Sequence, residues 1–98
     1  MNKIVINNCY GGFSLSDKAC KMLAESFNLD EYDLAYGRGI PRHDPRLIEV
    51  VEALGEDANG TCAELFVDEI EGNLYRISEY DGKERIVEPE DQEWIHID

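Results

Sequence analysis

Positively charged residues are scarce in this sequence. Lys and Arg total 9 against 22 Asp and Glu, so the 98-residue chain carries a formal net charge of -13. Because proteins bind nucleic acids mainly by neutralising phosphates with Lys and Arg, this balance argues against direct binding to DNA, RNA or an anionic membrane surface. Three roles stay open for the excess negative charge: a solvated surface, a mimic of nucleic acid, or a surface that docks on a basic patch of another protein.

Long apolar runs are also lacking. No run approaches the roughly 20 residues that span a bilayer, and the chain does not begin with a basic segment followed by a long apolar one. Only three cysteines are present, Cys9, Cys20 and Cys62, and none of them belongs to a CxxC pair. Neither a disulfide framework nor a zinc site is therefore indicated, and we expect a soluble protein in a reducing, cytoplasmic compartment.

Cysteine catalysis at Cys9 is a minor alternative that the sequence leaves open. Cys9 follows an apolar run and precedes a helix start, where a thiol can have a lowered pKa and act as a nucleophile. Such a thiol needs a base, and nothing in the spacing places His43 or His96, the two histidines, beside Cys9. We therefore expect no catalytic residue, no metal site and no cofactor.

Hydrophobic residues make up 43% of the chain, enough for the core of one small domain over residues 1–98. Residues 3–7 form an apolar β-type run, which predicts a strand covered on both faces. Ser14 precedes Asp17 by three residues in the manner of a capping box, so we expect a helix over residues 15–27. Residues 28–36 read as a turn or a short irregular helix. Asp44 and Pro45 then predict the start of a second helix that ends at Gly55.

Three further strands are expected over residues 61–70, 74–80 and 83–88. The last two flank Asp81-Gly82, a dipeptide that suits a two-residue hairpin turn because both positions need positive φ. The predicted fold class is α+β with the order β-α-α-β-β-β: a mainly antiparallel twisted sheet, strands two to four in a meander, and two helices on one face. The partner of the first strand stays open, and the acidic segment 89–98, with Trp94, is either an edge strand or a docking segment.

A glycine loop lies between the first strand and the first helix. A loop that feeds a helix start exposes backbone N–H groups near the positive end of the helix dipole, which favours anions. Asn7, Asn8 and Ser14 offer side-chain hydrogen bonds to a ligand. Gly11 and Gly12 let the backbone approach the ligand closely. Tyr10 or Phe13 can stack on a base. The alternative is a tight turn beside core aromatics, because the Lys-Ser/Thr ending of a P-loop and the third glycine of a dinucleotide fingerprint are absent.

A basic island precedes the second predicted helix. Its members are Arg38, Arg42, His43 and Arg46. Because cations near a helix N-terminus oppose the helix dipole, an anion is expected among them, either a phosphate or a carboxylate of the protein itself. Together with the glycine loop, Arg38, Arg42 and His43 form the predicted binding site.

Several short motifs run through the chain: Lys3-Ile4-Val5-Ile6-Asn7, Cys9-Tyr10-Gly11-Gly12-Phe13, Leu15-Ser16, Asp44-Pro45, Val50-Val51-Glu52, Leu54-Gly55, Ala58, Gly60 and Glu79-Tyr80-Asp81-Gly82. In these motifs, which cover most of its length, the chain resembles a family of small uncharacterised proteins encoded by bacteriophages and prophages. The resemblance implies a phage or prophage setting and an α+β fold, and it implies no activity and no catalytic residues. Members of that family close with a basic tail that contains His and Arg, whereas this chain ends Gln92-Glu93-Trp94-Ile95-His96-Ile97-Asp98.

Small phage accessory proteins commonly act on host proteins or host defence by binding, which is an argument from analogy. We therefore expect a non-enzymatic binding protein that sequesters a phosphorylated small molecule or nucleotide signal of host defence. A homo-oligomer would make a deeper pocket for this ligand. The alternative is an acidic inhibitor that binds a host protein directly, by nucleic-acid mimicry or by occluding an active site.

Overall fold

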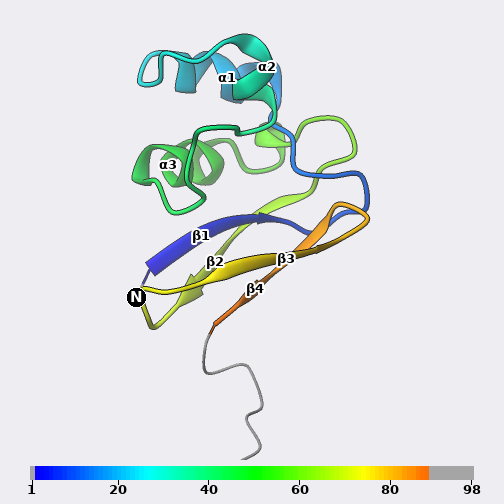
Figure 1. The fold of residues 1–98 in the computed structure, drawn as a ribbon. Helices are drawn as coiled ribbons and strands as arrows, with labels where there is room; N and C mark the ends of the chain where they lie inside the picture. The colour runs from blue at the N-terminus through cyan, green and yellow to red at the C-terminus, as the bar shows by residue number, and fades with distance from the viewer. Residues whose placement is uncertain (1, 89–98) are drawn as a thin grey trace, which may run out of the picture.

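The protein has three layers in the computed structural model, which describes residues 2–88. The helices form one layer, strands β1 and β2 the middle layer, and the hairpin β3–β4 the third (Figure 1). The elements in chain order are β1 (Asn2–Asn7), α1 (Asp17–Ala24), α2 (Glu31–Ala35), α3 (Pro45–Leu54), the 3₁₀ helix η1 (Gly55–Ala58), β2 (Leu65–Ile70), β3 (Arg76–Tyr80) and β4 (Lys83–Val87). The predicted α+β class and the helices on one face are confirmed.

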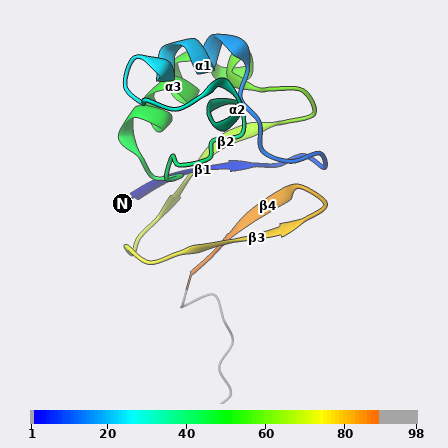
Figure 2. The same ribbon diagram turned by 45° about the horizontal axis from the view of Figure 1, so that its top comes forward.

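Strand β1 pairs antiparallel with β2, with Asn2 opposite Ile70 and Asn7 opposite Leu65. The hairpin β3–β4 is a separate two-stranded sheet. The predicted meander is therefore wrong at its first step, because β2 pairs with β1 and, within residues 2–88, not with β3. The connection over residues 71–75 carries the chain out of the middle layer to the other face of β1–β2 (Figure 2).

The two faces of β1 are buried in different clusters. Val5 packs into the larger core beneath the helices. Ile4 and Ile6 face the hairpin, where they pack with Ile70 and with Ile77 and other hairpin side chains. Since successive side chains of a strand point to opposite faces, a run of three apolar residues fits a strand that is covered on both sides, as predicted.

Helix α1 is shorter than the sequence indicated. Its N-cap is Ser16, whose hydroxyl accepts a hydrogen bond from the Ala19 N–H, and the helix spans Asp17–Ala24. The predicted cap Ser14 instead donates its hydroxyl to the Thr61 carbonyl, and Leu15 forms an isolated β-bridge before the helix begins. The Ser14–Asp17 spacing therefore did not mark the helix start.

Helix α3 and the hairpin turn agree with their local signals. The Asp44 carboxylate accepts from the Arg46 N–H, Pro45 occupies the first helical turn, and Gly55 caps the end with φ 57°. Asp81 and Gly82 have φ 51° and 93°, as the predicted turn requires.

No helix within residues 2–88 combines the length and apolar character that crossing a membrane demands. The predictions for residues 89–98 lie outside the described part of the chain.

Candidate functional site: the glycine loop and the hairpin turn

The glycine loop after β1 is closed by the hairpin turn between β3 and β4. The Gly11 N–H donates to the Asp81 carbonyl over 3.0 Å. A Cβ atom on Gly82 would collide with the backbone nitrogen of Gly12, so the two loops meet backbone to backbone. Gly11, Gly12 and Gly82 all have positive φ, which glycine adopts without strain. The glycines thus serve an interlock between two loops, which leaves the Gly11 N–H engaged within the protein.

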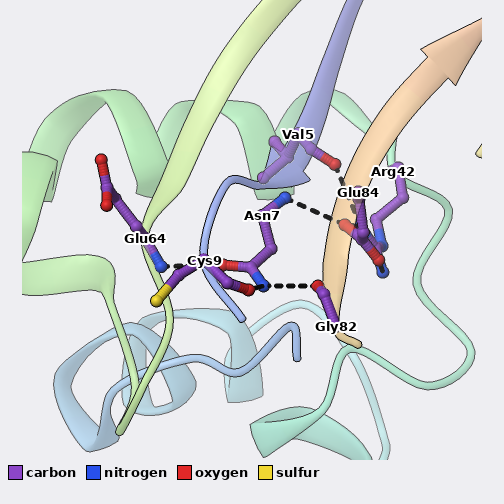
Figure 3. Close-up of polar contacts among 7 residues, drawn as sticks. All are labelled: Val5, Asn7, Cys9, Arg42, Glu64, Gly82 and Glu84. Atoms are coloured by element: carbon purple, nitrogen blue, oxygen red, sulfur yellow. Dashed lines mark hydrogen bonds and ion pairs between the residues drawn. The ribbon is translucent and has the colours of Figure 1, made fainter. Parts of the chain in front are cut away.

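The Asn7 side chain joins the two loops by hydrogen bonds. Its side chain is fully buried and donates two hydrogen bonds of 2.8 Å, to the Cys9 carbonyl and to the Gly82 carbonyl (Figure 3). Its amide oxygen accepts a third bond of 2.8 Å from the Glu64 N–H. Both polar atoms of the amide are therefore occupied by three different segments of the chain.

Glu84 on β4 supplies the anion for the basic island. Arg42 donates to the Glu84 carboxylate in a bidentate pair, from Nη1 to Oε1 at 2.6 Å and from Nη2 to Oε2 at 2.8 Å. The Asn7 N–H donates to the same Oε1 at 2.9 Å, and Arg42 Nη1 also donates to the Val5 carbonyl (Figure 3). Of the two anions left open by the sequence, phosphate or protein carboxylate, a carboxylate lies between Asn7 and Arg42.

Phe13 lies under this ion pair as a core residue. The Arg42 guanidinium carbon is 3.7 Å from the centroid of the Phe13 ring, whose residue is 7% exposed. A Cβ atom on Gly37 would approach the same ring to 2.7 Å, which explains a glycine there, with φ 66°. The ring is enclosed by the protein, so base stacking on Phe13 has no open face to use.

The remaining predicted site residues point elsewhere. The Arg38 guanidinium lies 5.1 Å from the ring centroid of Tyr32, and Nδ1 of His43 shares a 2.7 Å hydrogen bond with the Tyr75 hydroxyl. Asn8 is exposed, and its N–H donates to the carbonyl of Glu64, the residue before β2. The structure therefore brings together Asn7, the glycine loop and Arg42, while the side chains of Arg38 and His43 have other neighbours.

Other basic residues near α3 also have acceptors within the protein. Arg46 contacts Asp44 through Nη2 and Oδ2 at 3.0 Å and donates to the Ser26 carbonyl. The hydrogen bond from Arg46 holds the pKa of Asp44 below its ordinary value, and the same bond raises the pKa of Arg46.

Burial raises the pKa of the Tyr75 hydroxyl. The pKa of the Cys20 thiol is raised by burial and by Asp17 and Glu31.

Two tyrosines stand exposed above the interlocked loops. Tyr10 in the glycine loop and Tyr80 at the hairpin turn are 60% and 73% exposed, and their rings meet edge to face with centroids 6.4 Å apart. The Lys83 ammonium lies 5.5 Å from the Tyr10 ring centroid. These residues line a hollow of about 160 Å³ with Glu79 and other hairpin residues. Tyr80 was missed by the sequence reasoning, although its place beside the Asp81-Gly82 turn predicts exposure.

A scan against protein-family models and searches of curated proteins and solved structures find no match to this chain. Within the described range 2–88, no group of three or more His, Cys, Asp or Glu side chains is arranged to hold a metal ion. The interlocked loops and the surface that they present are therefore the features from which function is inferred.

Proposed function

We propose that the protein is a non-enzymatic binding domain that engages a host protein through Tyr10 and Tyr80. The observation that carries this proposal is the exposure of both rings, 60% and 73%, on two loops that are bonded to each other. In the phage or prophage setting implied by the sequence resemblance, such a domain would act as an acidic inhibitor of a host protein. This is the second of the two functions expected from the sequence.

The tyrosine pair has the chemistry of a protein interface. Tyrosine contributes a large apolar area and a polar hydroxyl while losing little conformational entropy, and it is enriched among the residues that dominate binding energy. The loops that carry Tyr10 and Tyr80 are fixed by the Gly11–Asp81 bond and by the Asn7 bond to the Gly82 carbonyl. Because the rings are positioned before a partner arrives, binding costs less ordering entropy.

The charge of the chain favours a basic partner. The net charge is -13, and Glu79 and Asp81 flank Tyr80 in sequence on either side of the exposed ring. Opposite charge on a partner would raise the rate of association, and salt would lower that rate. A basic residue of the partner can also lie over the Tyr80 ring as a cation–π contact.

A phosphorylated ligand at the predicted site would have to displace the Glu84 carboxylate. The carboxylate is bonded to Arg42 and to the Asn7 N–H, and its side chain is only 6% exposed. Displacement would break the bidentate ion pair with Arg42 and the hydrogen bond from the Asn7 N–H, which is costly. The sequestration of a phosphorylated signal therefore has less support from the geometry than protein binding, and it stays a prediction from the sequence.

The proposal is tested with two pairs of exposed tyrosines. Immobilised wild type, Tyr10→Ala/Tyr80→Ala and a matched control, Tyr32→Ala/Tyr36→Ala, are incubated with bacterial lysate, and the retained proteins are quantified by mass spectrometry. The control pair is also exposed, and its rings lie 4.9 Å apart on another surface. A tyrosine that dominates an interface contributes about 2 kcal/mol, which is roughly 30-fold in affinity. We therefore expect the first variant alone to bind one retained partner at least about 30-fold more weakly, and about 1,000-fold if both rings contribute fully.

Equal retention of that partner by all three proteins would contradict the proposal. Thermal unfolding of the wild type with nucleotides, cyclic nucleotides and inorganic phosphate tests the competing function on the same protein. A ligand at 100 times its dissociation constant stabilises by about 2.7 kcal/mol, so a phosphate site would be visible as a saturable rise in melting temperature. We expect no such rise.

A further inference from the structure

A second surface lies at the opposite end of β1 from the tyrosine pair. A groove of about 830 Å³ opens beside the first residues of β1, and Lys3 is among the residues that line it. Ile48 of α3 forms part of one wall, and Ile70 and Tyr75 form part of the other. The groove therefore lies at the edge of the β1–β2 sheet, between the helix layer and the segment that leads into the hairpin.

The backbone of β1 has an open position in this groove. The Val5 N–H donates to the Arg42 carbonyl and the Val5 carbonyl accepts from Arg42 Nη1, so Val5 directs its backbone groups away from β2. In an antiparallel pair, alternate residues direct these groups the same way, and the Asn7 N–H, bonded to Glu84, agrees. Lys3 therefore also presents its N–H and carbonyl to the groove, where no residue of the described chain pairs with them.

We propose that this groove binds an extended peptide segment of a partner protein, which adds to the edge of β1 as an antiparallel strand at Lys3. Strand addition to an exposed sheet edge is a general mode of peptide recognition, with backbone bonds for affinity and pockets for alternate side chains. The antiparallel direction follows because a single open residue can exchange both of its hydrogen bonds with one opposite residue only in that arrangement.

The walls of the groove define the side chains of the peptide. The residue opposite Lys3 has its side chain on the same face as that of Lys3, which reaches Glu52 on α3 at 3.1 Å. On that face Glu49 also lines the groove, and it has no ion-pair partner among residues 2–88. A Lys or Arg at this peptide position stands opposite the Lys3 ammonium, but that ammonium is already paired with Glu52. With its stem packed on Ile48, the peptide cation places its charge near Glu49, so the face carries two carboxylates for two cations.

The neighbouring peptide side chains point to the other wall. Ile70 and the ring of Tyr75 present apolar surface there, while the Tyr75 hydroxyl is bonded to His43, so these positions take apolar residues. The preferred segment is therefore apolar, basic, apolar. The net charge of -13 makes an acidic peptide or a second copy of this chain an unfavourable occupant. This binding surface is independent of Tyr10 and Tyr80, and either proposal can fail alone.

The experiment titrates isotope-labelled protein with the peptide serine-valine-lysine-valine-serine, acetylated and amidated at its ends, and follows backbone amide shifts by NMR. We expect shifts at Lys3 and Ile48. Methylating the lysine backbone nitrogen of the peptide removes the donor that faces the Lys3 carbonyl, so binding should weaken about tenfold or more. Methylating the nitrogen of the second valine, which points away from β1, should leave binding within about twofold.

A charge reversal gives a second readout that leaves the β1 backbone intact. Glu49→Lys should weaken binding of the unmodified peptide several-fold, whereas Glu25→Lys, at an exposed glutamate beyond the end of α1, should not. Equal affinity for both methylated peptides would overturn strand addition. Shifts confined to the Tyr10 and Tyr80 region, or no shifts at millimolar peptide, would overturn the groove as a peptide site and leave the proposed function standing.

Discussion

Removing the Glu84 carboxylate should destabilise the protein more than removing any exposed acid. Glu84→Ala leaves the Arg42 guanidinium without its bidentate partner and the Asn7 N–H without its acceptor. Breaking a buried ion pair by deleting one partner costs about 3–5 kcal/mol. The Arg42 side chain is 19% exposed, so water can solvate part of the orphaned charge. We therefore expect a loss near the lower limit, about 3 kcal/mol.

Urea unfolding at pH 7 measures this loss. For a slope of about 1–2 kcal/mol per molar urea, a loss of 3 kcal/mol lowers the midpoint by roughly 1.5–3 M. Glu52→Ala is the matched control, because the Lys3–Glu52 pair is 44% and 47% exposed. Exposed pairs contribute less than about 1 kcal/mol, so the control midpoint should move little.

Equal lowering of the midpoint by Glu84→Ala and Glu52→Ala would refute a special role for the Glu84 carboxylate. A second variant separates the lost ion pair from the loss of side-chain volume. Arg42→Met/Glu84→Met replaces both charges by apolar groups and leaves no charge unpaired, so it should be more stable than Glu84→Ala. A double variant less stable than Glu84→Ala would show that the ion pair is not what makes the single change costly.

Three further predictions concern individual residues. Gly82→Ala should cost roughly 1–3 kcal/mol in urea unfolding, since alanine is strained at φ 93° and its Cβ would collide with the glycine loop; an unchanged midpoint would contradict the interlock. At pH 7.5 the Cys20 thiol should alkylate more slowly than the exposed Cys62, because burial raises the Cys20 pKa, and equal rates measured by mass spectrometry would contradict this. The bond from Arg46 lowers the pKa of Asp44, so its stabilising effect is complete above the unfolded carboxyl pKa of about 3.9 and is lost as pH falls through the lower folded value. Urea midpoints at pH 6 and pH 3 should therefore differ less for Asp44→Asn than for the wild type, and equal differences would refute the assignment.

Features set by neighbouring residues could be predicted from the sequence. Helix α3 follows Asp44-Pro45 and ends at Gly55, and the hairpin turns at Asp81-Gly82, because these residues act on the backbone within a few positions of themselves. The strand expected over residues 61–70 is likewise present, as the shorter β2 (Leu65–Ile70). Local chemistry specified the type and the place of these elements in the chain.

Features set by tertiary contacts could not. An apolar run such as β1 carries no label for its partner, so its pairing with β2 had to come from the structure. The carboxylate for Arg42 is one of 22 acidic residues and lies 42 positions away, at Glu84. Tyr80 lies beside Tyr10 only because the hairpin turn contacts the glycine loop, and the sequence does not show this contact. The predicted site residues Asn7 and Arg42 both donate to the Glu84 carboxylate, and Glu84 was not among the predicted site residues.

The central claim is that the hairpin closes the glycine loop, and that the Glu84 carboxylate of the hairpin is the anion bound by Arg42 and the Asn7 N–H. Amide hydrogen exchange of the wild type measures this directly by NMR. The Asn7 and Gly11 N–H groups, bonded to Glu84 and to the Asp81 carbonyl, should exchange at least about 100-fold more slowly than an unstructured amide, whereas the Lys3 N–H that faces the groove should exchange fast. Exchange of Asn7 and Gly11 at the rate of Lys3 would show an open loop and contradict the account.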